Sequence, residues 1–131
     1  IKINQAKMTS FVFPGQGSQT LGMARDFCDN FKIAKVAFEE IEDYTNINIR
    51  KIIFTNEGDK LDLTQFTQIC VFATSYVIFK TYISENGINI SRINSMMGHS
   101  LGEYTALVCS EKIKLKECSL ILKKRGELMA N

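Results

Sequence analysis

The chain has 131 residues, of which 45% are hydrophobic and 23% charged, with a net charge of +2, four cysteines and a single histidine, His99. With a mean hydropathy of −0.04, this composition fits one soluble globular domain or part of one, and it excludes disorder, coiled coils and disulfide-rich scaffolds. Charges of both signs are spread along the chain, so neither nucleic-acid binding nor membrane binding is indicated.

The cysteines also argue against a metal site. They are widely spaced, form no CxxC pair and share one histidine, so buried free thiols are expected at Cys28, Cys70, Cys109 and Cys118. The longest apolar run, residues 69–79, is well short of the ~20 residues that cross a bilayer. The sequence therefore predicts no metal and no membrane segment.

The first half of the chain predicts a strand, a loop and helices. Thr9–Phe13 is a β-prone run that stops at Pro14 and enters a glycine-containing loop over residues 15–19. Met23–Tyr44 has the apolar spacing of one or two amphipathic helices. Ile47–Phe54 is a further short apolar piece to which the pattern assigns no structure.

The second half begins with the strongest helical pattern. Asp62–Glu85 predicts a long central helix buried on several sides, and Ile93–Met97 predicts a short strand. Helices are expected at Leu101–Ser110 and Lys114–Met129. This order is typical of an α/β domain with a short parallel sheet flanked by helices, and so few strands suggest the first half of a domain.

A nucleophile motif lies between the second predicted strand and its helix. Residues 98–102 read GHSLG and match the G-x-S-x-G elbow, which projects a serine oxygen out of a sheet. Ser100 is therefore the candidate nucleophile. The backbone N–H of Leu101, at the start of a helix, is a candidate oxyanion donor.

The earlier loop, GQGSQ at residues 15–19, is not a phosphate-binding loop. A dinucleotide fingerprint needs glycine near Thr20, and a P-loop needs Gly-Lys-Ser/Thr where Leu21-Gly22-Met23 stands. Two interpretations remain open. The loop is a plain strand-to-helix turn, or it supplies a second backbone N–H opposite Leu101.

Arg125 stands out on the last predicted helix. With about 100° per residue, an apolar stripe runs along that helix, formed by Leu115, Cys118, Ile121, Leu122, Leu128 and Met129. Arg125 falls within the stripe, and other charged side chains project from the opposite side, namely Lys116, Lys123, Lys124 and Glu127. A cation there needs an anion, which is either an internal carboxylate or an acidic substrate.

Three segments together carry a family resemblance. FPGQGSQ at 13–19, GHSLGEY at 98–104 and KRGELM at 124–129 resemble malonyl-CoA:acyl carrier protein transacylase of type II fatty acid synthesis, in order and at compatible separations. The resemblance covers essentially the whole chain. It implies an α/β-hydrolase-like acyltransferase, of which residues 1–131 are the N-terminal portion of the large subdomain.

The resemblance also implies a reaction. A malonyl group passes from malonyl-CoA to Ser100, and then to the phosphopantetheine thiol that acyl carrier protein carries, with no bound cofactor or metal. By resemblance, the backbone N–H groups of Gln16 and Leu101 hold the oxyanion, and Arg125 clamps the malonyl carboxylate. Gln68 matches a family glutamine that lines the site, although the proline that often follows it is Ile69 here.

The general base is the main departure. In the family it is a histidine well downstream of the elbow, so it is expected beyond Asn131, together with a small ferredoxin-like subdomain. His99 is a poor substitute because neighbouring side chains in a sharp turn point apart. We therefore expect His99 to pack or to stabilise the turn, and the 131 residues alone to be inactive.

Three other functions stay open. One is an acyltransferase domain of a polyketide or type I fatty acid synthase, and a second is an α/β-hydrolase esterase, which leaves Arg125 unexplained. The third is a non-catalytic half-domain that binds an acidic acyl-CoA or a protein. Abundant Ile, Lys and Asn suggest an AT-rich genome. With a type II pathway, that composition fits a plastid of apicoplast type, or else a bacterial cytoplasm.

Overall fold

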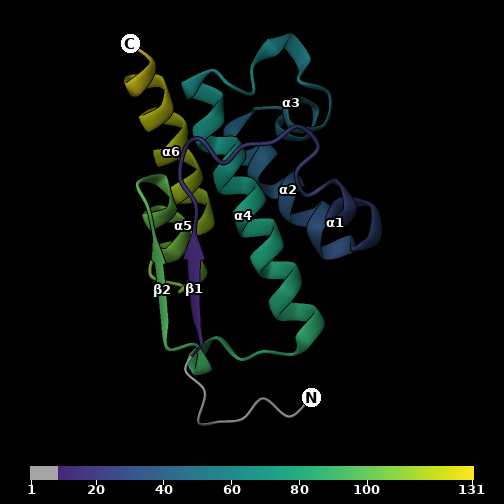
Figure 1. The fold of residues 1–131 in the computed structure, drawn as a ribbon, viewed down its shortest axis with the longest axis vertical. Helices are drawn as coiled ribbons and strands as arrows, with labels where there is room; N and C mark the ends of the chain where they lie inside the picture. Colours follow the sequence, from purple (N-terminus) through teal and green to yellow (C-terminus); the bar gives the residue numbers. More distant parts are fainter. Residues whose placement is uncertain (1–8) are drawn as a thin grey trace.

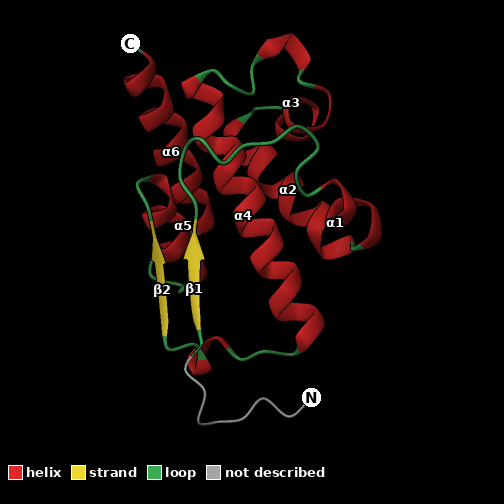
Figure 2. Ribbon diagram, in the orientation of Figure 1, coloured by secondary structure: helices red, strands yellow, loops and turns green. Residues whose placement is uncertain are grey.

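The computed structural model describes residues 9–131 (Figures 1 and 2). Its elements are, in chain order, β1 (Ser10–Phe13), α1 (Arg25–Asn30), α2 (Lys32–Thr45), α3 (Ile49–Thr55), α4 (Thr64–Asn86), β2 (Ser95–Gly98), α5 (Leu101–Cys109) and α6 (Leu115–Ala130). Short 3₁₀ turns stand at Glu57–Asp59 and Ile90–Arg92. The predicted α/β class is confirmed, and the predicted boundaries differ from the observed ones by at most two residues.

The two strands form a parallel pair. Figure 2 shows β1 and β2 side by side and pointing the same way, in a register that pairs Ser10 with Ser95 and Phe13 with Gly98. One face packs on helices through Phe13, which is buried. Val12 and Met97 lie opposite each other on the other face and are exposed. Both loops that follow the strands therefore leave the same edge of the sheet.

Helix α4 is the centre of the helical layer. Every residue from 67 to 74 is buried, because α2, α5 and α6 pack around this stretch. Phe79 of α4 meets the rings of Phe11 and Phe13 edge to face, which ties α4 to β1. By length and composition α4 is also apolar enough to cross a membrane, with 61% of the relevant window buried. Core helices of soluble proteins meet the same criteria.

The buried face of helix α6 differs from the apolar stripe that the sequence predicted. Its buried residues are Cys118, Ser119, Leu122 and Gly126. The outer part of the predicted stripe is exposed, with Leu128 at 61% and Met129 at 51%. A Cβ added to Gly126 would lie 2.9 Å from the Gln65 carbonyl oxygen, so α6 approaches α4 most closely there. The helix is thereby rotated relative to the stripe, and Arg125 lies at the edge of the buried face.

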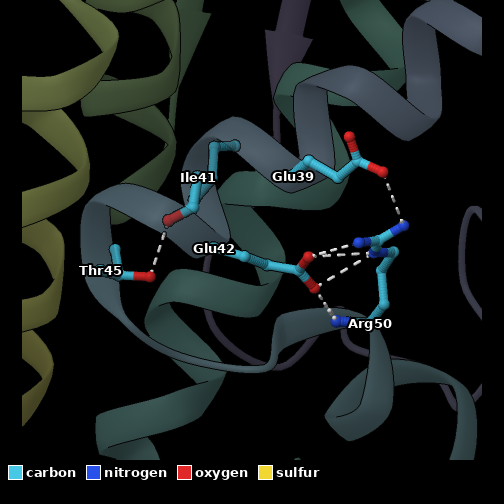
Figure 3. Close-up of polar contacts among 5 residues, drawn as sticks. All are labelled: Glu39, Ile41, Glu42, Thr45 and Arg50. Atoms are coloured by element: carbon cyan, nitrogen blue, oxygen red, sulfur yellow. Dashed lines mark hydrogen bonds and ion pairs between the residues drawn. The ribbon is translucent and has the colours of Figure 1, made fainter.

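Helix α3 lies within the apolar piece that had no predicted structure. A carboxylate from α2 fixes its first turn (Figure 3). Glu42 accepts a hydrogen bond from the backbone N–H of Arg50 at 2.9 Å and bonds its guanidinium, with Nη2 to Oε1 at 2.6 Å. The backbone N–H would have no partner within the helix. The long-range pairing of Glu42 with Arg50 is invisible to a pattern of apolar spacing.

The cysteine prediction is confirmed, since all four cysteines are free and buried. Burial raises the pKa of the Cys70 and Cys118 thiols to about 12. Lys123 does not project into solvent as predicted. It is half-buried, and its Nζ donates to the carbonyl oxygen of Thr45 at 2.7 Å, at the C-terminal end of α2. A lysine there satisfies a carbonyl that the helix leaves without a partner.

Candidate active site

Ser100 lies in a strained turn between β2 and α5. Its backbone has φ 56° and ψ −114°, a conformation that costs a non-glycine residue about 1–3 kcal/mol. The turn is held by two backbone bonds, from His99 N–H to Phe13 O at 3.2 Å and from Gly102 N–H to His99 O at 3.0 Å. A Cβ at Gly102 would collide with the Phe13 carbonyl, so this glycine allows α5 to lie against β1.

The glutamine loop lies directly beside this turn. A Cβ on Gly15 would come within 2.6 Å of the His99 carbonyl oxygen, so the two loops are in close contact. Within residues 9–131, neither the Gln16 nor the Leu101 backbone N–H donates a hydrogen bond to another protein group. The two predicted oxyanion donors are therefore free in neighbouring loops at one edge of the sheet.

Arg125 reaches Ser100 from α6. Its Nη2 donates to Ser100 Oγ at 2.9 Å, and its Nη1 donates to Gln68 Oε1. The guanidinium carbon also stands 5.6 Å from the centre of the Tyr104 ring, a cation–π arrangement. Among the described residues Arg125 has no ion pair. The internal carboxylate that the sequence left open as its partner is not found in that part of the chain.

Gln68 is the buried support of this site. The residue is 0% exposed, and its Nε2 donates to Gln16 Oε1 at 3.0 Å. Its Oε1 accepts from Arg125, so the structure places this predicted site residue next to Arg125. Ile69, which follows it in the sequence, is a regular buried residue of α4, so the missing proline leaves the helix intact.

A groove adjoins the guanidinium. It has a volume of about 720 Å³ and is lined by Tyr104, Leu120, Ile121, Lys124, Arg125, Leu128 and Met129. Its walls are mostly the apolar side chains of α6 that the helix rotation leaves exposed. The groove thus has a largely apolar wall, with the cations of Lys124 and Arg125 beside it.

No histidine is hydrogen-bonded to Ser100 Oγ within residues 9–131. The His99 side chain is exposed, and no hydrogen bond joins it to Ser100 within residues 9–131. It therefore does not pack as expected, whereas its backbone does hold the turn. No group of three or more metal-ligating side chains occurs in the same part of the chain.

Two side chains that support the glutamine loop were not predicted from the sequence. Thr64, the first residue of α4, and Asp62, just before it, hold the glutamine loop through side-chain hydrogen bonds to Gln16 and Gln19 respectively. Both are polar residues at the start of a long apolar helix, which was the only available signal. The partners stand 48 and 43 residues away in the chain, so spacing gave no indication of the contact.

Comparison with known proteins identifies the family of this chain. The family model described as the acyl transferase domain matches residues 10–131. The chain belongs to the acyl transferase family. The predicted resemblance is thus confirmed at the level of the family.

Several members of the acyl transferase family are similar to it in detail. A malonyl CoA-acyl carrier protein transacylase from Bacillus subtilis is 37% identical over 122 residues, which are 93% of this chain and 30% of that protein. The structure of the malonyl CoA-acyl carrier protein transacylase from Coxiella burnetii superposes with a TM-score of 0.87 at 34% identity, covering 94% of this chain and 38% of that one.

A third match is a malonyl-transacylase in complex with a type II PKS acyl-carrier protein, with a TM-score of 0.85 at 34% identity. It covers 94% of this chain and 39% of that one. The chain therefore spans between about a third and two fifths of the length of the relatives it matches. The curated relatives named here and the Coxiella structure are bacterial.

Proposed function

We propose that this chain carries the nucleophile half of an enzyme that transfers a malonyl group from malonyl-CoA to the phosphopantetheine thiol of acyl carrier protein, for fatty acid biosynthesis. One observation carries the proposal. The guanidinium of Arg125 lies 2.9 Å from the Ser100 oxygen in a turn built for a nucleophile. The names of the relatives support the choice of substrate and partner.

The short distance between cation and nucleophile favours a malonyl group. In malonyl-CoA the free carboxylate carbon is two C–C bonds from the thioester carbon, a separation of about 2.5 Å. A cation that binds this carboxylate must therefore lie within a few ångströms of the attacking oxygen. Arg125 meets this condition, and its planar fork suits a carboxylate.

The first half-reaction places the acyl group on the serine. Ser100 Oγ attacks the thioester carbon and gives its proton to a general base, which the family resemblance places outside residues 9–131. The backbone N–H groups of Gln16 and Leu101 hold the oxyanion, while Arg125 exchanges its bond to Ser100 for bonds to the carboxylate. The C–S bond then breaks, and the CoA thiolate leaves as a thiol after protonation.

The second half-reaction reverses these roles. The phosphopantetheine thiol of acyl carrier protein loses its proton to the same base and attacks the malonyl ester. The Ser100 oxygen leaves and recovers a proton, which regenerates the free serine. No cofactor enters either half-reaction. Water must be kept from the ester between the two steps.

The test is transfer of radiolabelled malonyl from malonyl-CoA to acyl carrier protein by the full-length protein. We expect Ser100→Ala to abolish both transfer and labelling of the protein. The matched control is Ser110→Ala, which we expect to retain activity because Ser110 caps the end of α5 opposite to Ser100 and its hydroxyl bonds only the α5 backbone. Full transfer by the Ser100→Ala protein would refute the proposal.

A second candidate has its own support. The carrier protein in one similar complex is that of a type II PKS, so an acyltransferase serving a polyketide or type I fatty acid synthase fits the same residues. Flanking synthase domains in the full-length protein, or transfer only to a polyketide carrier, would favour it. An esterase is less well supported, because it does not use Arg125. Rapid hydrolysis of uncharged p-nitrophenyl esters without transfer would favour it.

We also propose that the protein works in a plastid of apicoplast type. The support is the Ile, Lys and Asn-rich composition together with a type II pathway, and the bacterial relatives fit a pathway of bacterial ancestry. Microscopy of the full-length protein with a fluorescent tag at its C-terminus tests this location. Residues 1–131 alone are expected to be inactive, and stable acylation of Ser100 in that isolated segment at the rate of the full-length protein would contradict this.

A further inference from the structure

A chain of side-chain hydrogen bonds connects the start of α4 to the arginine at the nucleophile. Thr64 Oγ1 accepts from Gln16 Nε2 at 3.2 Å, and Gln16 Oε1 accepts from Gln68 Nε2 at 3.0 Å. Gln68 Oε1 in turn accepts from Arg125, whose other nitrogen donates to Ser100. Four elements or loops thus meet in one continuous network.

The chemistry of arginine fixes the direction of this chain. A guanidinium only donates, so Gln68 must present its oxygen to Arg125 and its NH₂ group to Gln16. Gln16 must then present its own oxygen to Gln68, which leaves its NH₂ group facing Thr64. The Thr64 hydroxyl is therefore used as an acceptor, and it ends the chain.

Burial shows where the chain is weakest. Gln68 is 0% exposed and cannot find another partner in water. Gln16 is exposed and Thr64 half-buried, so water competes for the bond between them. The bond to Thr64 adds to the Gln68–Gln16 bond in keeping the Gln16 amide oxygen turned towards Gln68, because rotation of that amide would cost both bonds.

The loop that carries Gln16 is held to the same segment at a second point. Gln19 Nε2 donates to Asp62 Oδ1 at 2.9 Å, and Gln19 Oε1 accepts from the backbone N–H of Gly17 at 2.9 Å. The segment before α4 therefore fixes the loop backbone independently of Thr64. Loss of the Thr64 bond should then affect the Gln16 side chain more than the loop backbone.

We propose that Thr64 is a positioning residue for Arg125, acting through Gln16 and Gln68, and that it thereby strengthens selection of acyl groups that end in a carboxylate. This inference rests on the proposed role of Arg125. Thr64 does not touch the acyl group. It keeps the buried amide of Gln68 oriented, and that amide holds one side of the guanidinium.

The test compares malonyl-CoA with acetyl-CoA, which lacks the carboxylate, as acyl donors for the full-length protein. Thr64→Val keeps the side-chain shape and removes the acceptor. We expect its malonyl-over-acetyl ratio of kcat/KM to fall about three- to tenfold, mainly through a higher KM for malonyl-CoA. Thr64→Ser retains the hydroxyl and should restore the ratio. Thr55→Val, on α3, is the matched control and should leave the ratio unchanged.

A double variant separates positioning from general damage. If Thr64 acts through Arg125, Thr64→Val should not lower the ratio further once Arg125→Ala is present. An unchanged ratio in Thr64→Val, equal losses for both acyl donors, or failure of Thr64→Ser to restore the ratio would overturn the inference. None of these results affects the proposed function. That proposal fails only if the unaltered protein does not transfer malonyl, or if the Ser100→Ala protein still transfers it.

Discussion

Replacing Arg125 with alanine should remove the preference for malonyl-CoA. In the free protein the guanidinium bonds Gln68 and, at 2.9 Å, Ser100; it can keep the Gln68 bond and exchange the Ser100 bond for bonds to a carboxylate. Two hydrogen bonds to a charged group, at about 1.5 kcal/mol each, amount to about 3 kcal/mol. We therefore expect kcat/KM for malonyl-CoA to fall about 100-fold relative to acetyl-CoA.

The same change should lower stability. Gln68 is 0% exposed, so loss of Arg125 leaves its oxygen buried without its donor, which costs about 1–3 kcal/mol. Arg125→Lys keeps the positive charge and a donor. We expect it to recover part of the stability, but little of the selectivity, because an ammonium lacks the planar fork.

The assay measures acylation of the full-length protein by each acyl-CoA, with the thermal midpoint recorded for every variant. Lys116→Ala is the control, because Lys116 is an exposed cation on the same helix and should leave the ratio unchanged. The reasoning is refuted if Arg125→Ala retains the malonyl preference. It is also refuted if both acyl donors lose activity equally while the thermal midpoint stays unchanged.

Three further predictions concern packing, ion pairing and pH. Gly126→Ala places a methyl group against the α4 backbone, so we expect the unfolding free energy to fall by about 1–3 kcal/mol and malonyl selection to weaken. An unchanged unfolding free energy and an unchanged malonyl preference would contradict the close approach of α6 to α4. Glu42→Gln should lower the unfolding free energy in urea by about 1–2 kcal/mol, because Arg50 loses a largely buried charged partner. Glu39→Gln should lower it by under about 0.5 kcal/mol, because the Glu39 carboxylate is half-exposed and 3.8 Å from Arg50. Equal losses would contradict the conclusion that Glu42 is the main partner of Arg50. Burial raises the pKa of Cys70 from 9.0 to about 12, so the stability associated with this neutral thiol is complete below pH 9 and is lost as the pH rises towards 12. Cys70→Ala should therefore reduce the loss of unfolding free energy between pH 8 and pH 10 by about 1 kcal/mol. An unchanged dependence of the unfolding free energy on pH would contradict this prediction.

Local patterns were sufficient for most elements. The long helix α4 was predictable because apolar residues repeat over more than twenty positions, and both strands stop at residues that break a strand or enter a turn. Helix α3 was not predictable, since its first turn depends on Glu42 from another helix. The rotation of α6 likewise depends on the close approach of Gly126 to the α4 backbone. A helical wheel drawn from the α6 sequence alone, with about 100° per residue, contains no information on such a contact.

Some features of the candidate site were also predictable from local sequence, and others depend on tertiary packing. The elbow sequence indicated Ser100 as a candidate nucleophile, and the charge within an apolar stripe indicated Arg125 as a candidate anion-binding residue, because both signals are local in the sequence. The 2.9 Å contact between them follows only from how α5 and α6 pack on α4. The role of Thr64 is more distant still, because it depends on which end of a buried amide faces which partner.

The pairing of β1 with β2 has a consequence for how the protein is made. The paired serines Ser10 and Ser95 are 85 residues apart in the chain, so closing this contact carries a large loop entropy and favours slow, late formation. At about 5–20 residues per second on the ribosome, β1 waits roughly 4–17 s for its partner to be synthesised. During that interval the glutamine loop and the serine turn are not together, so Ser100 acquires its surroundings only after β2 and the helices that follow it have been synthesised.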